Sequence, residues 1–203
     1  MRRLVFLVMV LALVLTTVCF AQQKFLLIDD FEGVISAGPS GTVDSGTGNG
    51  SALQVTASTD IKQSGNQSIK VDFDAVEGGY MWVARGKELV AKSAGWLIKP
   101  EDILWDKYNA ISFYIYGTGS NAEVAFDIKD NGNEIWRFLV KDDFKGWKQV
   151  ACAFNEFFVR GDWQPDNADK NWQLDFPIKS FQFEPRPSAK GTLYFDAVVL
   201  VEK

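Results

Sequence analysis

A short polar segment with one large aromatic ring stands out in the last third of the chain. It covers residues 159–165, VRGDWQP, and precedes a loop rich in Pro, Asp and Asn. An indole can stack on the apolar face of a pyranose, while guanidinium, carboxylate and carboxamide groups can hydrogen-bond its hydroxyls. A loop that only has to be soluble does not need a tryptophan. The residue types therefore predict contact with a sugar, with Trp163 as the stacking plate and Arg160 and Asp162 among the polar partners.

The composition excludes several other kinds of chemistry. The chain has no histidine, which rules out Ser-His-Asp and Cys-His catalysis, histidine-ligated zinc and histidine acid–base chemistry. Its net charge is −5 and it carries no basic stripe, so we expect neither nucleic acid nor an anionic membrane as a partner. Hydrolysis by a pair of carboxylates is not excluded.

The N-terminal residues have the composition of a secretory signal peptide. A basic start (MRR) is followed by an uncharged apolar run over residues 4–18, and residues 19–21 (CFA) suit cleavage before Gln22. The run is short and wrongly flanked for a membrane span. We expect residues 1–21 to be removed and residues 22–203 to form a single, monomeric domain that is secreted, periplasmic or part of the cell envelope. Lipid attachment at Cys19 is the alternative processing.

Only Cys152 then remains, so no intrachain disulfide can form, and its apolar neighbours predict a buried small side chain.

The elements that must position these residues are strands, because helical periodicity is almost absent. Residues 33–50 and 86–109 predict long loops, and a third loop over 155–177 carries the VRGDWQP segment. About ten short strands separated by turn signals are typical of an all-β fold, an antiparallel β-sandwich of the jelly-roll type. The expected strands cover residues 25–28, 52–57, 68–73, 80–85, 110–116, 123–129, 135–141, 147–153, 178–184 and 192–201.

Alternation along these strands predicts which side chains leave the core. It places Asp127 and Arg137 opposite apolar neighbours, and it puts Ser180, Gln182 and Glu184 on an outer face. Such a face could bind hydroxyl groups, although alternation alone favours an ordinary solvated surface.

Four aromatic residues in strands either pack in the core or face a binding groove. Trp136 and Trp147 lie on faces that we expect to be buried. Tyr80 and Trp82 share one face of their strand, so both belong to the groove or both to the core.

Several segments, in order along the mature chain, carry a family resemblance. They are IDDFEG (28–33), GY (79–80), AISF (110–113), GWK (146–148), FFVRGDWQP (157–165), LDFPIKSF (174–181) and GTLYFDAVVL (191–200). In this order the set resembles a family 11 carbohydrate-binding module. The resemblance implies a β-jelly roll that binds β-glucan chains in a groove on its concave sheet and catalyses no reaction.

The resemblance also implies roles for individual residues. Arg160, Asp162 and Trp163 fall on the family's ligand-contacting arginine, aspartate and tyrosine, and Tyr80 falls on a second platform aromatic. Ser180 and Gln182 fall on polar positions of the groove. Two departures concern further tyrosines of the family, which are replaced by Pro185 and in the Pro39-Ser40 region of this chain.

A calcium site is a further expectation. Asp30 and Glu32 lie beside the first strand, and Asp196 lies in the last strand, which in such sandwiches runs close to the first. Together with oxygens from the Ser64-Gly65-Asn66 turn, these carboxylates could complete the six to eight oxygen ligands that calcium takes. The resemblance supports a structural Ca²⁺ here, while carboxylates at strand ends on the surface are the alternative interpretation.

Two other functions compete with polysaccharide binding. A small jelly-roll glycoside hydrolase would need two carboxyls facing each other across the groove, and the candidates are Asp127, Asp162 and Glu184. Arg137 and Arg160 would hold these groups ionised, so we predict no enzyme activity. A structural or partner-binding sandwich of the cell envelope is the other alternative.

Overall fold

The structure is a computed structural model and describes residues 24–203. The predicted signal peptide over residues 1–21 and the alternative lipid site at Cys19 lie outside the described residues. Within the described part of the chain, no helix is both long and apolar enough to cross a membrane. The strands are β1 (Phe25–Asp29), β2 (Asp44–Gly48), β3 (Ala52–Ser58), β4 (Ser68–Ala75), β5 (Tyr80–Gly86), β6 (Tyr108–Thr118), β7 (Glu123–Lys129), β8 (Ile135–Lys141), β9 (Lys145–Ala153), β10 (Phe158–Val159), β11 (Ser180–Pro185) and β12 (Ala189–Glu202). Short 3₁₀ helices cover Pro100–Asp102, Trp105–Lys107 and Phe154–Glu156.

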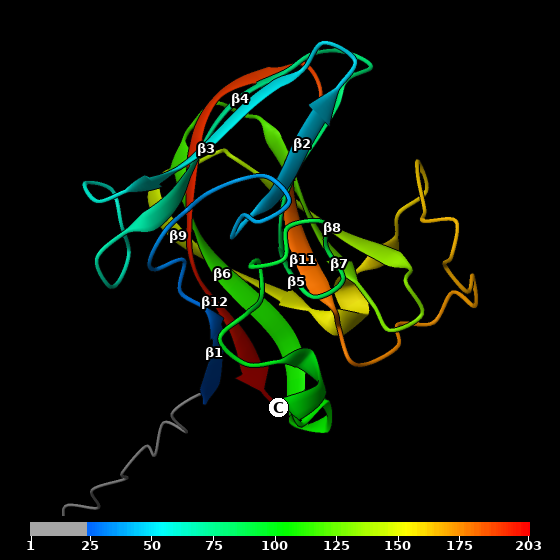
Figure 1. Ribbon diagram of the computed structural model, residues 1–203. Coiled ribbons are helices and arrows are strands. Elements are labelled where there is room, and N and C mark those ends of the chain that lie inside the picture. Colours follow the sequence, from blue (N-terminus) through cyan, green and yellow to red (C-terminus); the bar gives the residue numbers. More distant parts are fainter. Residues whose placement is uncertain (1–23) are drawn as a thin grey trace, which may run out of the picture.

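Two antiparallel sheets of six strands each make up the fold (Figure 1). The first sheet has the order β3-β4-β12-β6-β9, with β1 also paired to β12. The second has the order β10-β8-β7-β11-β5-β2. The predicted antiparallel sandwich is therefore confirmed, with twelve strands in the described residues where we expected about ten.

The core lies between the two sheets and is dominated by phenylalanine. Phe183 of β11 stacks on Phe195 of β12, with ring centroids 3.8 Å apart, and this contact joins the sheets. Phe31, Phe113, Phe126 and Phe181 are also almost completely buried. Each such side chain contributes about 1.5–3 kcal/mol of transfer free energy.

Cys152 and Trp136 belong to the same core, as predicted. Burial raises the pKa of the Cys152 thiol, which fits an inert packing role.

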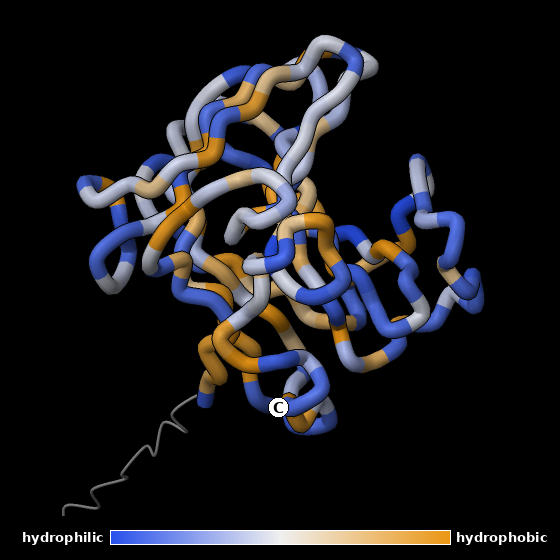
Figure 2. Tube along the Cα trace, viewed as in Figure 1, coloured by the Kyte–Doolittle hydropathy of each residue, from blue (hydrophilic) through white to orange (hydrophobic). Residues whose placement is uncertain are grey.

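The long loop between β10 and β11, at the right of Figure 1, is mostly hydrophilic in Figure 2.

Two predictions of local structure were wrong. Strand β2 lies inside the segment that we expected to be a loop, because Gly46 and Gly48 pair with Trp82 and Tyr80 of β5 and receive their rings. The aromatic residues supply the packing that the glycines lack, a pattern known from glycines on sheet edges. A tertiary contact here overrides the low strand propensity of glycine.

Trp147 was predicted to be buried but is half-buried on the outer face of the first sheet. In β9 the inward positions are those of Val150 and Cys152, so alternation places residue 147 on the opposite face. There its ring meets Tyr116 nearly edge-on, with centroids 5.5 Å apart.

Candidate functional site

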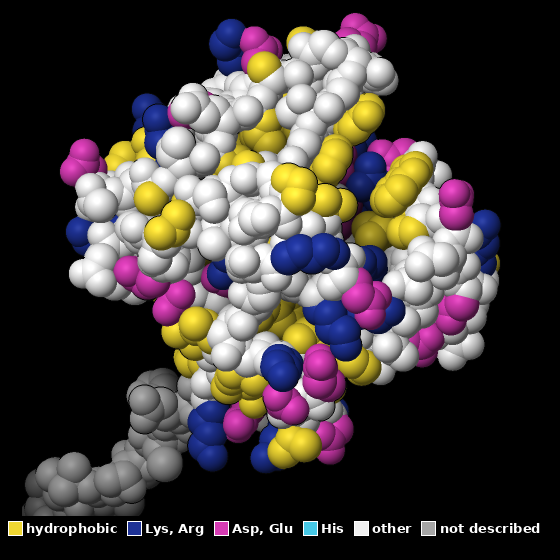
Figure 3. All heavy atoms as spheres, viewed as in Figure 1, with side chains coloured by type: hydrophobic (Ala, Val, Ile, Leu, Met, Phe, Trp, Pro, Cys, Tyr) yellow, Lys and Arg dark blue, Asp and Glu magenta, His cyan; other side chains and the backbone are white. Residues whose placement is uncertain are grey.

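A cavity of about 750 Å³ opens on the outer face of the second sheet. Figure 3 shows it as a cleft at the upper right, with hydrophobic side chains on both of its sides. Five of the predicted ligand-binding residues line it: Tyr80, Arg160, Asp162, Trp163 and Gln182. The structure therefore brings together residues that are up to 102 positions apart in the sequence, and Trp82 and Glu184 join them in the lining.

Aromatic rings from two separate elements stand at the cavity. Tyr80 and Trp82 come from β5, and their rings are nearly parallel, 12° apart in orientation with centroids separated by 6.1 Å. Trp163 comes from the loop after β10 and is 57 % exposed. The Arg160 guanidinium lies 5.6 Å from the centroid of the Trp163 ring, a cation–π contact that orients the indole.

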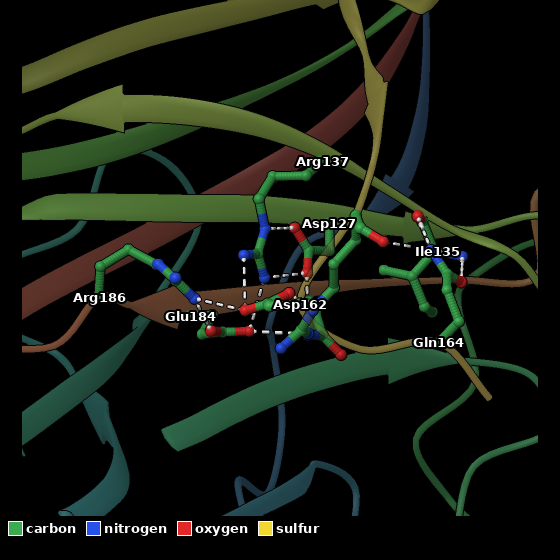
Figure 4. A network of polar contacts seen from close by, with 9 residues as sticks. Asp127, Ile135, Arg137, Asp162, Gln164, Glu184 and Arg186 are labelled. Carbon is green, nitrogen blue, oxygen red and sulfur yellow. Dashed lines mark hydrogen bonds and ion pairs between the residues drawn. The ribbon is translucent and has the colours of Figure 1, made fainter. Parts of the chain in front are cut away.

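An ion-pair network forms the floor of the cavity (Figure 4). Arg137 of β8 makes a bidentate pair with Asp127 of β7, both N···O distances being 2.8 Å, and its Nη2 also lies 2.9 Å from Glu184 of β11. Arg160 reaches the same two carboxylates at 3.2 and 2.9 Å and holds Asp162 through a 2.7 Å contact. Sheet register explains this convergence, since Asp127 pairs directly with Arg137 and with Gln182.

Three residues predicted to contact a ligand are buried and do not line the cavity. Asp127, Arg137 and Ser180 are 1 %, 5 % and 5 % exposed, respectively. Alternation put Asp127 and Arg137 on the face of Glu184, which they meet in the ion-pair network, but it could not show that both are buried. Asp127 pairs with Arg160, and Arg137 pairs with Asp162, so both contact side chains that do line the cavity.

The network also sets the electrostatics of the cavity. Partial burial acts to raise the pKa of Asp162, but the hydrogen bond from Arg160 and the charges of Arg160, Arg137 and Arg186 lower it to about 2. Burial likewise acts to lower the pKa of Arg137, yet its hydrogen bonds and ion pairs with Asp127 and the charge of Glu184 raise it. The lowered pKa of Asp162 keeps this carboxyl ionised, whereas a general acid needs a raised pKa.

Gln164 has a structural task that residue types alone did not reveal. In the sequence it reads as a hydrogen-bonding partner for sugar hydroxyls. In the structure its Oε1 accepts a hydrogen bond from the Ile135 main-chain N–H at 2.7 Å, and its Nε2 donates to the Ile135 and Arg160 carbonyls at 2.9 and 2.8 Å (Figure 4). The carboxamide thus ties the loop that carries Trp163 to the start of β8.

The carboxylates predicted to hold calcium lie around the loop over residues 63–67. Glu32 accepts hydrogen bonds from the main-chain N–H groups of Asn66 and Gln67, and Asp196 accepts them from Gln63 and Ser64. Asp30 accepts a hydrogen bond from the N–H of Glu32, within its own loop. Residues 24–203 contain no group of three or more His, Cys, Asp or Glu side chains suited to a metal ion, so main-chain carbonyls would have to complete a site.

The chemistry of these donors nevertheless fits a hard cation. Asp196 is completely buried, and its partners within the described chain are N–H groups rather than a charged side chain. Burial raises the pKa of Asp196, and the nearby charge of Glu32 adds to the increase. The carbonyl oxygens of Phe31 and Gly33 also converge on one point, the Gln67 amide nitrogen, at 2.8 and 2.6 Å.

Comparison with known proteins finds a matching family and a related enzyme. The family model "Carbohydrate binding domain (family 11)" matches residues 16–203. Endoglucanase H of Acetivibrio thermocellus is 28 % identical over 183 residues, which are 86 % of this chain but only 18 % of that protein. The chain therefore spans less than a fifth of the length of this relative.

Solved structures support the same fold. A family 11 carbohydrate-binding module from Clostridium thermocellum, in complex with a β-1,3-1,4-mixed-linked tetrasaccharide, aligns with a TM-score of 0.67 at 24 % identity, covering 87 % of this chain and 94 % of that one. The family 11 module of the cellulosomal cellulase Lic26A-Cel5E from the same organism aligns with a TM-score of 0.64 at 21 % identity, covering 90 % and 95 %.

Proposed function

The chain belongs to the family 11 carbohydrate-binding domains, and from this premise we propose that its cavity binds a β-linked glucan chain. The family is one of non-catalytic binding domains, so binding rather than hydrolysis is the activity of this domain. The observation that carries the proposal is the convergence of Tyr80, Trp163, Arg160, Asp162 and Gln182 on one cavity. The complex of a structurally similar module with a mixed-linked tetrasaccharide supports β-glucan as the class of ligand.

In this proposal the aromatic rings and the polar groups have separate tasks. Trp163 and Tyr80 stack on apolar faces of sugar rings, because both present large exposed surfaces at the cavity. Arg160, Asp162 and Gln182 exchange hydrogen bonds with hydroxyl groups. The ion pairs below hold these side chains in place before the ligand arrives, so binding loses little conformational entropy.

We also propose that the domain is secreted or located in the periplasm or envelope, after removal of residues 1–21. A structural Ca²⁺ would be held by Glu32 and Asp196 together with main-chain oxygens, with Asp30 as the third predicted ligand. When bound, such an ion would tie the first loop to the last strand and neutralise the buried charge of Asp196.

Calorimetric titration tests the binding proposal directly. Mixed-linkage glucan, xyloglucan and cello-oligosaccharides are titrated into the wild type, Trp163→Ala and a control, Trp172→Ala. Trp172 is similarly exposed, at 54 %, but does not line the cavity. We expect Trp163→Ala to weaken binding about tenfold or more, the usual loss for a binding hot spot. Trp172→Ala should bind as the wild type does.

Two results would overturn the proposal. If no glycan binds the wild type at millimolar site concentration, the structural or partner-binding sandwich becomes the leading function. Equal losses for Trp163→Ala and Trp172→Ala would remove the cavity from the proposal and leave the ligand site elsewhere.

A further inference from the structure

Strand β2 has an unusual composition for the edge of a sheet, with glycine at two of its five positions. The backbone at Gly46 and Gly48 lies outside the left-handed region that favours glycine, so conformation does not explain them. Their surroundings do. A Cβ atom on Gly46 would lie 2.6 Å from Cζ2 of Trp82, and one on Gly48 would overlap the Tyr80 ring.

The two rings therefore lie against the backbone of the edge strand. Trp82 and Tyr80 are the direct partners of Gly46 and Gly48 in the β2–β5 register. Side chains opposite each other on one sheet face normally stand side by side, and a glycine partner lets an aromatic ring lean across instead. The result is two nearly parallel rings beside each other along one wall of the cavity.

Hydrogen bonds fix the indole in this position. Trp82 Nε1 donates to Asp44 Oδ1 at 3.2 Å, and the other carboxylate oxygen of Asp44 accepts a 2.6 Å hydrogen bond from the Val90 main-chain N–H. The polar edge of Trp82 is thus used inside the protein. The carbon surface of the ring is the part that can stack on a sugar, and Trp82 lines the cavity.

We infer that Trp82 is a ligand-contacting residue that extends the Tyr80 platform to two rings, and that Gly46 and Gly48 are positioning residues for this platform. The inference rests on the proposed function and adds to it a platform of two rings, Tyr80 and Trp82. Two rings in series contact more than one sugar unit, so the ligand is a chain of at least two neighbouring units.

A double-mutant cycle with a mixed-linkage glucan oligosaccharide tests the inference. Trp82→Ala and Gly46→Ala should each raise the Kd about tenfold, and the double variant should bind no more weakly than Trp82→Ala alone. Such non-additivity is expected only if Gly46 acts through the Trp82 ring. Trp82→Phe should recover part of the affinity, because it keeps a ring at the same place.

A matched control comes from the residue between the two glycines. Thr47 lies in the same strand and is exposed, and its side chain alternates to the other face. Thr47→Ala should leave the Kd unchanged. Melting temperatures of all variants show whether a loss of affinity reflects unfolding.

The outcomes separate this inference from the proposed function. If Trp163→Ala weakens binding while Trp82→Ala and Gly46→Ala bind as the wild type does, the two-ring platform is wrong and the cavity remains the site. If Gly46→Ala weakens binding equally with and without Trp82, the positioning role is wrong. A wild type that binds no glucan overturns the proposed function and this inference together.

Discussion

Removing the Arg137 guanidinium should lower the free energy of unfolding far more than removing a cation at the surface. Arg137 is 5 % exposed and touches Asp127 and Glu184, which are 1 % and 3 % exposed. In Arg137→Met the side chain keeps much of its length and loses its charge. Asp127 then keeps Arg160 as its one cationic partner among the described residues, while Glu184 keeps Arg160 and Arg186.

The size of the effect follows from burial. Breaking a buried ion pair by removing one partner costs about 3–5 kcal/mol, because the remaining charge stays in a poorly solvating site. With an m-value of about 2 kcal/mol per molar urea, the unfolding midpoint should fall by about 2 M. Arg186→Met is the matched control: its side chain is 26 % exposed while it pairs with the same Glu184 and with Asp162. It should cost about 1 kcal/mol or less.

Equilibrium unfolding in urea, followed by tryptophan fluorescence and circular dichroism, measures both values. A second variant, Arg137→Met with Asp127→Asn, restores the charge balance of the network and should lose less than the sum of the two single changes. Equal losses for Arg137→Met and Arg186→Met would refute the reasoning. So would strict additivity in the double variant, since it would mean that the buried charges do not interact.

Three further outcomes are expected. Trp136→Ala should lower the free energy of unfolding by about 3–5 kcal/mol, because the residue is 8 % exposed in the core, and urea unfolding alongside Trp172→Ala checks this. The pKa of Asp162 is depressed to about 2 from 3.8, so its stabilisation is present above about pH 4 and disappears as the pH falls through 2. Since its side chain is 46 % exposed, solvent screening limits the effect to about 1 kcal/mol, and the stability difference between wild type and Asp162→Asn at pH 5 should vanish at pH 2. Excess chelator should lower the melting temperature if calcium binds the folded form, and an unchanged melting curve would remove the calcium proposal.

Strand positions could be predicted from the sequence where apolar and polar residue types alternate between two turns, as in residues 123–129. The bounds expected for residues 123–129 and 135–141 match β7 and β8 residue for residue. Strand β2 was not predicted because the residue that packs over Gly46, Trp82, lies 36 residues further along the chain. A segment rich in Gly, Ser and Thr carries no local sign of such a partner, so low strand propensity predicted a loop there.

The candidate site shows the same division between local and distant information. Arg160, Asp162 and Trp163 are neighbours in sequence, and their residue types predicted their common place in one cavity. Gln164 belongs to the same segment, but its role depends on Ile135, 29 residues earlier, and only the fold reveals that contact. Burial of Arg137 is equally a tertiary property, since alternation gives the face of a side chain and not what covers it.

The ion-pair network at the cavity explains how one surface can be rich in ionisable groups and still suit a neutral polymer, the proposed ligand. Three arginines (Arg137, Arg160 and Arg186) pair with three carboxylates (Asp127, Asp162 and Glu184), so the formal charges of the network cancel. Each group is held by partners of opposite sign, which fixes its position and keeps Asp162 ionised. A glycosidase needs the reverse, an acid that is protonated near neutral pH. The same ion pairs that hold the cavity side chains in place therefore keep Asp162 ionised, which opposes a role as general acid.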